Sequence, residues 1–165
     1  METECPFEII RKTKNLNKYK TKMKVPFSPP DMSELEVNEV ITCAYTYTAT
    51  ASVTCHVGAK VVMVDTAPGS FEMDYDKLAD AITERTKAVI PVDLAGIVCD
   101  YDKVFAAVES KRYLFHPSND LQKALGRVLV LADAAHAFGA QRKGKMCGEI
   151  ADFTSFSFHA VKNLT

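Results

Sequence analysis

Residues 128–140 have the sequence VLVLADAAHAFGA, in which an unbroken apolar run ends at the carboxylate of Asp133. Successive apolar residues, without the alternation of a half-exposed strand, are typical of a strand buried on both faces of a parallel sheet. A carboxylate at the end of such a strand is costly to bury unless it has a cationic or protonated partner. The stretch therefore predicts a buried strand over 128–132 and a polar site that begins at Asp133.

On both sides of this strand, short apolar segments alternate with helical patterns. The other predicted strands cover 41–44, 61–64, 88–92 and 153–157, and the predicted helices cover 46–57, 74–85 and 100–110, with a short helix after Asp31 or Ser33 that uses Leu35, Val37 and Val40. This alternation indicates βαβ units, so we expect an α/β fold with a mostly parallel sheet and helices on both faces. Ligands of such sheets bind beyond the carboxyl ends of the strands. The candidate ligand-binding residues are therefore 45–47, Asp93, 133–136 and 157–162, which follow the predicted strands.

The composition excludes several classes of protein. A chain of 165 residues with 47% hydrophobic residues and a net charge of -1 is neither disordered nor a generic nucleic-acid binder, and it has no apolar run that could span a membrane. Five scattered cysteines without a C-x-x-C pair indicate reduced thiols of a cytoplasmic protein. Residues 1–24 are basic and lack a secretory apolar core, so we interpret them as a solvated terminal segment, with a contact to an anionic surface as the alternative.

Two interpretations of Asp133 stay open from the residues alone. It is either a helix N-cap or a carboxylate that keeps a heterocyclic nitrogen protonated, as the pyridinium of pyridoxal phosphate requires. His136 follows by three residues, which is one helical turn and the same helix face. A metal-binding module of Asp133, His136 and His159 is a further hypothesis, but no pair of these residues has the spacing of metal ligands.

Three more residues near predicted strand ends can take part in chemistry. Lys162 follows an aromatic-rich strand, and a partly desolvated lysine can form a Schiff base and shuttle protons. The Ser157 hydroxyl can contact a phosphate, and the ring of Tyr47 can stack on a flat cofactor. The ordinary alternatives are a solvated surface lysine and an aromatic residue that fills the core.

Three segments together resemble a known family. AYTYTATAS (44–52), ADAAHAFGA (132–140) and SFSFHAVKNLT (155–165) are similar to the pyridoxal-phosphate-dependent nucleotide-sugar aminotransferases of the DegT/StrS type, which have the fold type I architecture. VPFSPPDMSELEV (25–37) and ERTKAVIPVDLAGIVCDYD (84–102) look like two further family segments. The pair D-A-A-H-A-x-G-A and S-F-x-x-x-K-N, in this order, is highly specific.

The resemblance implies pyridoxal 5'-phosphate as the cofactor and a role for five residues. Lys162 would be the catalytic residue that forms the Schiff base, and Asp133 would pair with the pyridinium nitrogen. His136, where relatives often carry Gln, would lie near the 3-oxygen of the cofactor. Ser157 would touch the phosphate, and Tyr47 would stack on the ring. Family members with His in place of the lysine are dehydratases, so Lys162 favours transamination.

The resemblance also implies substrates and a domain organisation. The reaction would move an amino group from glutamate or glutamine to a keto-sugar nucleotide, in a homodimer in full-length relatives and without a nucleic-acid or membrane partner. Two features depart from the family: the S-G-T-like phosphate-binding segment before Ile41 is missing, and the chain ends soon after Lys162, where relatives continue into a small C-terminal domain. We therefore expect residues 25–165 to form a partial large domain without the small domain. The alternative is a non-catalytic remnant or a partner-dependent fragment of the fold.

Overall fold

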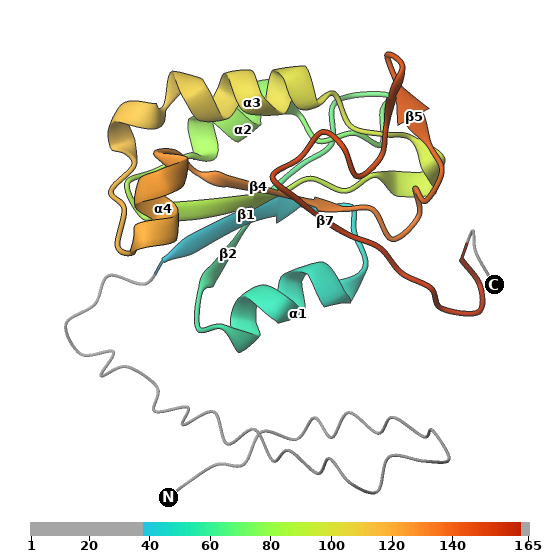
Figure 1. Cartoon of the computed structure of the whole chain (residues 1–165), viewed down its shortest axis with the longest axis horizontal. Coiled ribbons are helices and arrows are strands. Elements are labelled where there is room, and N and C mark those ends of the chain that lie inside the picture. The colour runs from blue at the N-terminus through green and yellow to red at the C-terminus, as the bar shows by residue number, and fades with distance from the viewer. Residues whose placement is uncertain (1–37, 163–165) are drawn as a thin grey trace, which may run out of the picture. The chain divides into compact units, whose positions relative to one another are not determined.

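A five-stranded sheet forms the centre of the structure, a computed structural model that describes residues 38–162 (Figure 1). In spatial order its strands are β2 (Lys60–Val64), β1 (Glu39–Cys43), β3 (Thr86–Ile90), β4 (Leu129–Asp133) and β7 (Phe153–Ser155). Every neighbouring pair is parallel, so the five carboxyl ends lie at one edge of the sheet. The predicted α/β class with a mostly parallel sheet is confirmed.

Helices cover both faces of the sheet, as the sequence predicts. Figure 1 shows α1 (Thr48–His56) on one face, and α2 (Tyr75–Ala81) with α3 (Tyr101–Ser110) on the other. Ile41, Val89 and Val130, from β1, β3 and β4, lie beside one another on one face of the sheet and are completely buried. On the other face of β4, Leu129 and Leu131 are only half-buried, so the strand expected to be buried on both faces is fully buried on one. None of the helices within residues 38–162 is long and apolar enough to cross a membrane.

The connections contain elements that the apolar pattern does not predict. They are the helix α4 (Asp120–Leu125), the 3-10 turns η1 (Leu94–Gly96) and η2 (Arg112–Leu114), and the antiparallel hairpin of β5 (Gln141–Arg142) and β6 (Lys145–Met146). The α4 helix starts at Asn119, whose side chain accepts the N–H of Gln122, and ends at Gly126 in the left-handed conformation. These two positions are standard helix start and stop signals.

The predicted short helix after Asp31 or Ser33 is wrong where it can be compared, because Val40 lies in β1. The strand begins at Glu39, whose buried carboxylate forms ion pairs with Lys60 at 3.1 Å and Arg85 at 2.9 Å. Burial alone would raise the pKa of Glu39, but hydrogen bonds and these two cations outweigh it and lower the pKa. The rest of the predicted helix, like the basic segment 1–24, lies outside the described residues.

Three other predicted elements are longer than the observed ones. The helix over 46–57 begins only at Thr48, the helix over 74–85 ends at Ala81, and the strand over 153–157 ends at Ser155. In the second case Ile82 has extended backbone angles, which turn the chain toward β3. The segment after Ser155 is therefore a loop, and it carries two of the residues singled out from the sequence.

Candidate active site

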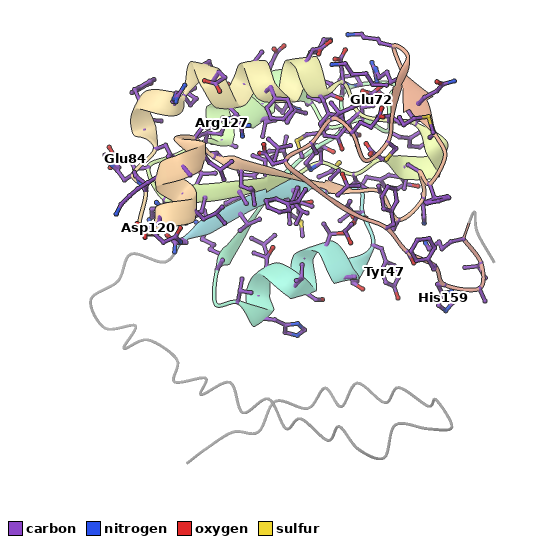
Figure 2. The ribbon with its side chains drawn as sticks, in the orientation of Figure 1. Tyr47, Glu72, Glu84, Asp120, Arg127 and His159 are labelled. Carbon is purple, nitrogen blue, oxygen red and sulfur yellow. The ribbon has the colours of Figure 1, made fainter. Side chains whose placement is uncertain are left out.

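The five residues proposed from the sequence follow three strands of the sheet. Tyr47 follows β1, Asp133 and His136 lie at and after the end of β4, and Ser157 and Lys162 follow β7. Because these strands are parallel, the segments that follow them leave the same edge of the sheet, as Figure 1 shows. Figure 2 shows Tyr47 and, in the segment after β7, His159 on that side of the molecule.

Asp133 is anchored at this edge through both its backbone and its carboxylate. Its N–H donates to the carbonyl of Pro91 and its carbonyl accepts the N–H of Asp93, each at 2.9 Å. One carboxylate oxygen accepts the hydroxyl of Thr50 at 2.7 Å, and the other accepts the N–H of Ala135 at 3.2 Å. The side chain is thus half-buried and oriented by donors from two different segments.

The interpretation of Asp133 as a helix N-cap is wrong. The segment after it forms tight turns, in which the N–H of Ala137 donates to the carbonyl of Ala134, and not a helix. For the same reason His136 does not share a helix face with Asp133. It is half-buried in this turn, and within residues 38–162 no hydrogen bond joins the two side chains.

Aromatic contacts hold the loop after β7 against the loop after β4. Phe138 packs edge-to-face on Phe156 and on Phe158, with ring centroids 5.4 and 5.7 Å apart. The N–H of Ala134 also donates to the carbonyl of Ser155 at 2.9 Å. The segment that carries Ser157 is therefore packed beside the loop that contains His136.

Ser157 and Lys162 are organised by local hydrogen bonds around His159. The Ser157 hydroxyl oxygen accepts the N–H of His159 at 3.4 Å, and the N–H of Lys162 donates to the carbonyl of His159 at 2.8 Å. Both side chains are half-buried. Within residues 38–162, no ion pair or hydrogen bond links the Lys162 amine to Asp133.

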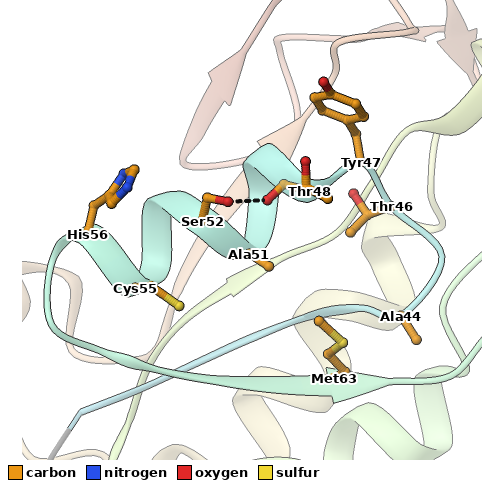
Figure 3. Close-up of a pocket in the computed structure, with 9 residues that line it drawn as sticks. All are labelled: Ala44, Thr46, Tyr47, Thr48, Ala51, Ser52, Cys55, His56 and Met63. Atoms are coloured by element: carbon orange, nitrogen blue, oxygen red, sulfur yellow. Dashed lines mark hydrogen bonds between the residues drawn. The ribbon is translucent and has the colours of Figure 1, made fainter. Parts of the chain in front are cut away.

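Tyr47 lies directly before α1 and its ring is 76% exposed. It also borders a pocket of about 370 Å³ between α1 and the edge strand β2 (Figure 3). The lining includes Thr46, Ser52, Cys55 and Met63, but not the other four residues proposed from the sequence. The exposed ring contradicts the alternative that Tyr47 fills the core.

Thr50 is a site residue that the sequence analysis missed. It is buried on α1 and donates to Asp133, and its own oxygen lies 2.7 Å from the hydroxyl oxygen of Thr46. The available signal was the spacing of Thr46, Thr50 and Thr54, which places three hydroxyls on one face of a helix. Which strand that face packs against is a tertiary contact that the spacing does not contain.

Asp93, which also follows a strand end, points into the core and not toward the site. Its side chain is 1% exposed and accepts hydrogen bonds from the N–H of Cys99 at 2.8 Å, the hydroxyl of Tyr101 at 3.1 Å and the thiol of Cys147 at 3.3 Å. Burial raises the pKa of the Asp93 carboxyl and raises the pKa of the Cys147 thiol to about 12. This cluster therefore joins the β3–α3 connection and the start of α3 to the segment after β6 within the core.

Comparison with known proteins relates the chain to enzymes of sugar metabolism. A family model described as the DegT/DnrJ/EryC1/StrS aminotransferase family matches residues 31–165. A protein of Streptococcus pneumoniae, assigned as a sugar aminotransferase and solved in its PLP form, is 60% identical with a TM-score of 0.76, over 78% of this chain and 33% of that one. The same protein was also solved in a PMP form and in an apo form.

Curated relatives are similar over the same part of the chain. GDP-perosamine synthase of Caulobacter vibrioides is 38% identical over 78% of this chain and 30% of its own length. UDP-2-acetamido-2-deoxy-3-oxo-D-glucuronate aminotransferase of Pseudomonas aeruginosa is 38% identical over 77% of this chain and 31% of its own length. The 165-residue chain thus spans about 30% of the length of the curated relatives it matches.

Proposed function

Because the chain belongs to the DegT/DnrJ/EryC1/StrS aminotransferase family, we propose that it carries the cofactor-binding part of an enzyme that aminates a keto-sugar nucleotide, with glutamate or glutamine as the amino donor. The observation that supports this function most is the anchored carboxylate of Asp133 at the same sheet edge as the segment that carries Lys162. The sugar-nucleotide substrates in the names of two relatives support the substrate class.

The family uses pyridoxal phosphate, and the chemistry of the side chains at this edge fits that group. Asp133 offers a negative charge for a protonated ring nitrogen, Tyr47 an exposed ring for stacking, and Lys162 an amine without a partner among the described residues. His136 would lie near the 3-oxygen, and Ser157 would donate a hydrogen bond to the phosphate. When bound, the cofactor acts as an electron sink for the charge that develops on the substrate carbon.

Three residues of this chain would then have distinct roles in the reaction. Asp133 keeps the proton on the ring nitrogen through its charge, and Tyr47 covers one side of the ring. The Nζ of Lys162 would take a proton from the substrate carbon that carries the amino group and would deliver the same proton to C4′ of the cofactor. A positioned amine of this kind contributes through general acid–base catalysis.

A partner-dependent fragment is the second candidate, and the exposed apolar residues at the site edge favour it. Tyr47 and Phe158 are exposed, and Val161, next to Lys162, is 80% exposed. Exposed apolar side chains on segments that leave the same sheet edge favour a surface that another protein surface covers. In that case the site would be completed by a second copy of the protein, as the homodimer implied by the family resemblance requires.

Reductive trapping tests the proposed function even where cofactor binding is weak, because reduction is irreversible. The full chain is incubated with pyridoxal phosphate, reduced with borohydride, and digested, and the lysine that carries the pyridoxyl group is mapped by mass spectrometry. We expect Lys162 to be labelled first at low cofactor concentration. Lys162→Arg should abolish that label, whereas Lys145→Arg, a change in the exposed β6 strand, should leave it unchanged. A label spread evenly over surface lysines would overturn the assignment.

A further inference from the structure

Two threonine hydroxyls and the Asp133 carboxylate form a continuous hydrogen-bonded chain. The Oγ1 of Thr46 lies 2.7 Å from that of Thr50, which in turn lies 2.7 Å from Oδ2 of Asp133. A hydroxyl has one proton, and an ionised carboxylate can only accept. Thr50 therefore donates to Asp133, so its oxygen is left to accept from Thr46. The contact between the two threonines, whose direction is otherwise open, runs from Thr46 to Thr50.

The chain is built into the fold and is not a surface contact. Thr50 is buried on α1, and Asp133 ends β4, which lies two strands away from β1 in the sheet. Thr54, one turn further along α1 and also buried, donates to the carbonyl of Thr50 at 3.4 Å and, within residues 38–162, to no carboxylate. One threonine of this helix face thus reaches the carboxylate while its matched neighbour does not.

This geometry restricts how Asp133 presents its charge. Oδ2 is bonded from α1 and Oδ1 from the N–H of Ala135 in the following turn, so rotation of the carboxylate would break a contact on one side or the other. A hydrogen bond to a charged group is about twice as strong as one between neutral groups, and a donor behind it strengthens it further. Thr46, which borders the pocket of Figure 3, supplies that second donor.

We propose that Thr50 is a positioning residue: its hydroxyl, oriented by Thr46, fixes the Asp133 carboxylate in the orientation that faces the ring nitrogen of the cofactor. The inference rests on the proposed function for the identity of that ring. The hydrogen-bonded chain itself belongs to the protein without cofactor. Thr50 touches neither substrate nor cofactor and acts only through Asp133.

The first test is spectroscopic and uses the full chain without cofactor. The ¹³C carboxyl resonance of Asp133 is followed at neutral pH in protein labelled at aspartate, and Asp133→Asn identifies it by its loss. We expect Thr50→Val to shift this resonance and Thr50→Ser, which keeps the hydroxyl, to restore the wild-type position. Thr54→Val, the same change one turn away, should have no effect. Thr46→Val should give a smaller shift of the Asp133 resonance in the same direction. If Thr50→Val does not fold, an unchanged resonance in Thr46→Val would overturn the inference.

The second test repeats the borohydride trapping with the same variants at a cofactor concentration below saturation. Loss of a charge-assisted hydrogen bond predicts roughly a tenfold decrease in Lys162 labelling for Thr50→Val. Thr50→Ser and Thr54→Val should label like the wild type. An unchanged carboxyl resonance and unchanged labelling in Thr50→Val would overturn the inference. If the carboxyl resonance shifts in Thr50→Val and returns in Thr50→Ser, but Lys162 of the wild type carries no specific label, the inference about Thr50 stands and the proposed function is overturned.

Discussion

At the scale of single residues, Asp152 shows how one carboxylate joins two strands. Asp152 directly precedes β7. Its carboxylate oxygens accept hydrogen bonds from both terminal nitrogens of Arg127 at 2.7 Å and from the N–H of Val130 in β4 at 2.8 Å. Removing Asp152 would leave the largely buried Arg127 with only the half-exposed Glu109, 3.4 Å away, as its ion-pair partner within the described residues. We expect Asp152→Asn to lower the free energy of unfolding by about 3 kcal/mol in denaturant titrations. Asp120→Asn, an exposed carboxylate paired with Lys123, should have no measurable effect.

The same residue predicts a pH dependence. Burial by itself would raise the pKa of Asp152, but the hydrogen bonds from Arg127 and the Val130 N–H outweigh it and hold the pKa below its ordinary value. A lowered pKa means that the stabilisation is complete above the unfolded value, about 4, and is lost as the pH falls through the folded pKa. The stability gap between wild type and Asp152→Asn should therefore stay constant near neutral pH and close in acid. A gap that persists unchanged down to pH 2 would contradict the assignment.

At the scale of elements, the long apolar segments are those that the sequence predicts well. The strand expected over 128–132 is β4 at Leu129–Asp133, and the helix expected over 100–110 is α3 at Tyr101–Ser110. Both bury a regular apolar pattern, so their local preference and their tertiary environment agree. The α4 helix carries its own signals at Asn119 and Gly126, but it buries no side chain fully and so has no apolar pattern to read.

The residues of the candidate site, like the elements, could be predicted from the sequence only in part. The strand-end rule selects Asp133 and Lys162 because it depends only on strand positions and on parallel pairing. The partners of Asp133 could not be read in this way, because the contact to Thr50 spans 83 positions of the chain and depends on how α1 packs against the sheet. The turn around His136 was likewise mistaken for a helix, because a spacing of three residues is compatible with both.

The β5–β6 hairpin has two-residue strands and depends on tertiary contacts through Arg142. This side chain donates to the carboxylate of Glu72 at 2.9 Å and to the carbonyl of Val98 at 2.8 Å. Because these bonds are charge-assisted, Arg142→Ala should lower stability by roughly 2 kcal/mol and speed amide hydrogen exchange in the hairpin. Exchange in β4 should not change. Lys145→Ala, in the exposed partner strand, is the matched control and should leave the hairpin as protected as in the wild type.

At the scale of the whole molecule, apolar side chains remain exposed on β7 and on the segment that follows it. Phe153 in the edge strand β7 is half exposed, Phe158 is 62% exposed, and Val161 is 80% exposed. Such residues favour association. We expect the 165-residue chain to self-associate with rising concentration in sedimentation velocity, and Phe158→Ser combined with Val161→Ser to shift it toward monomer. Val57→Ser, a change at the exposed C-terminal end of α1, should leave the self-association unchanged. A wild-type chain that is monomeric at all concentrations would exclude this edge as a contact surface.

The binding of pyridoxal phosphate by the 165-residue chain depends on how many groups hold the phosphate. Ser157, the residue we propose for this contact, would contribute about 1.5–3 kcal/mol as a hydrogen bond to a charged group. Stacking on Tyr47 adds about 0.5–1.5 kcal/mol beyond burial. Micromolar affinity requires about 8 kcal/mol, and a phosphate dianion is normally bound by several backbone N–H groups at a helix N-terminus. The segment that provides them in relatives, according to the family resemblance, is absent between Val40 and Ile41, which are adjacent in β1.

We therefore expect an absorbance titration of the purified 165-residue chain with pyridoxal phosphate to show weak binding, without saturation in the micromolar range. The bond to Lys162 could compensate for part of the missing phosphate contacts only if its amine is held in place, so Lys162→Arg serves as the control for binding that does not involve the lysine. Weak binding that Lys162→Arg reduces further would agree with a site that has its lysine and carboxylate but lacks phosphate donors. Saturable micromolar binding of the wild type, lost in Lys162→Arg, would show that donors within these 165 residues replace the absent segment.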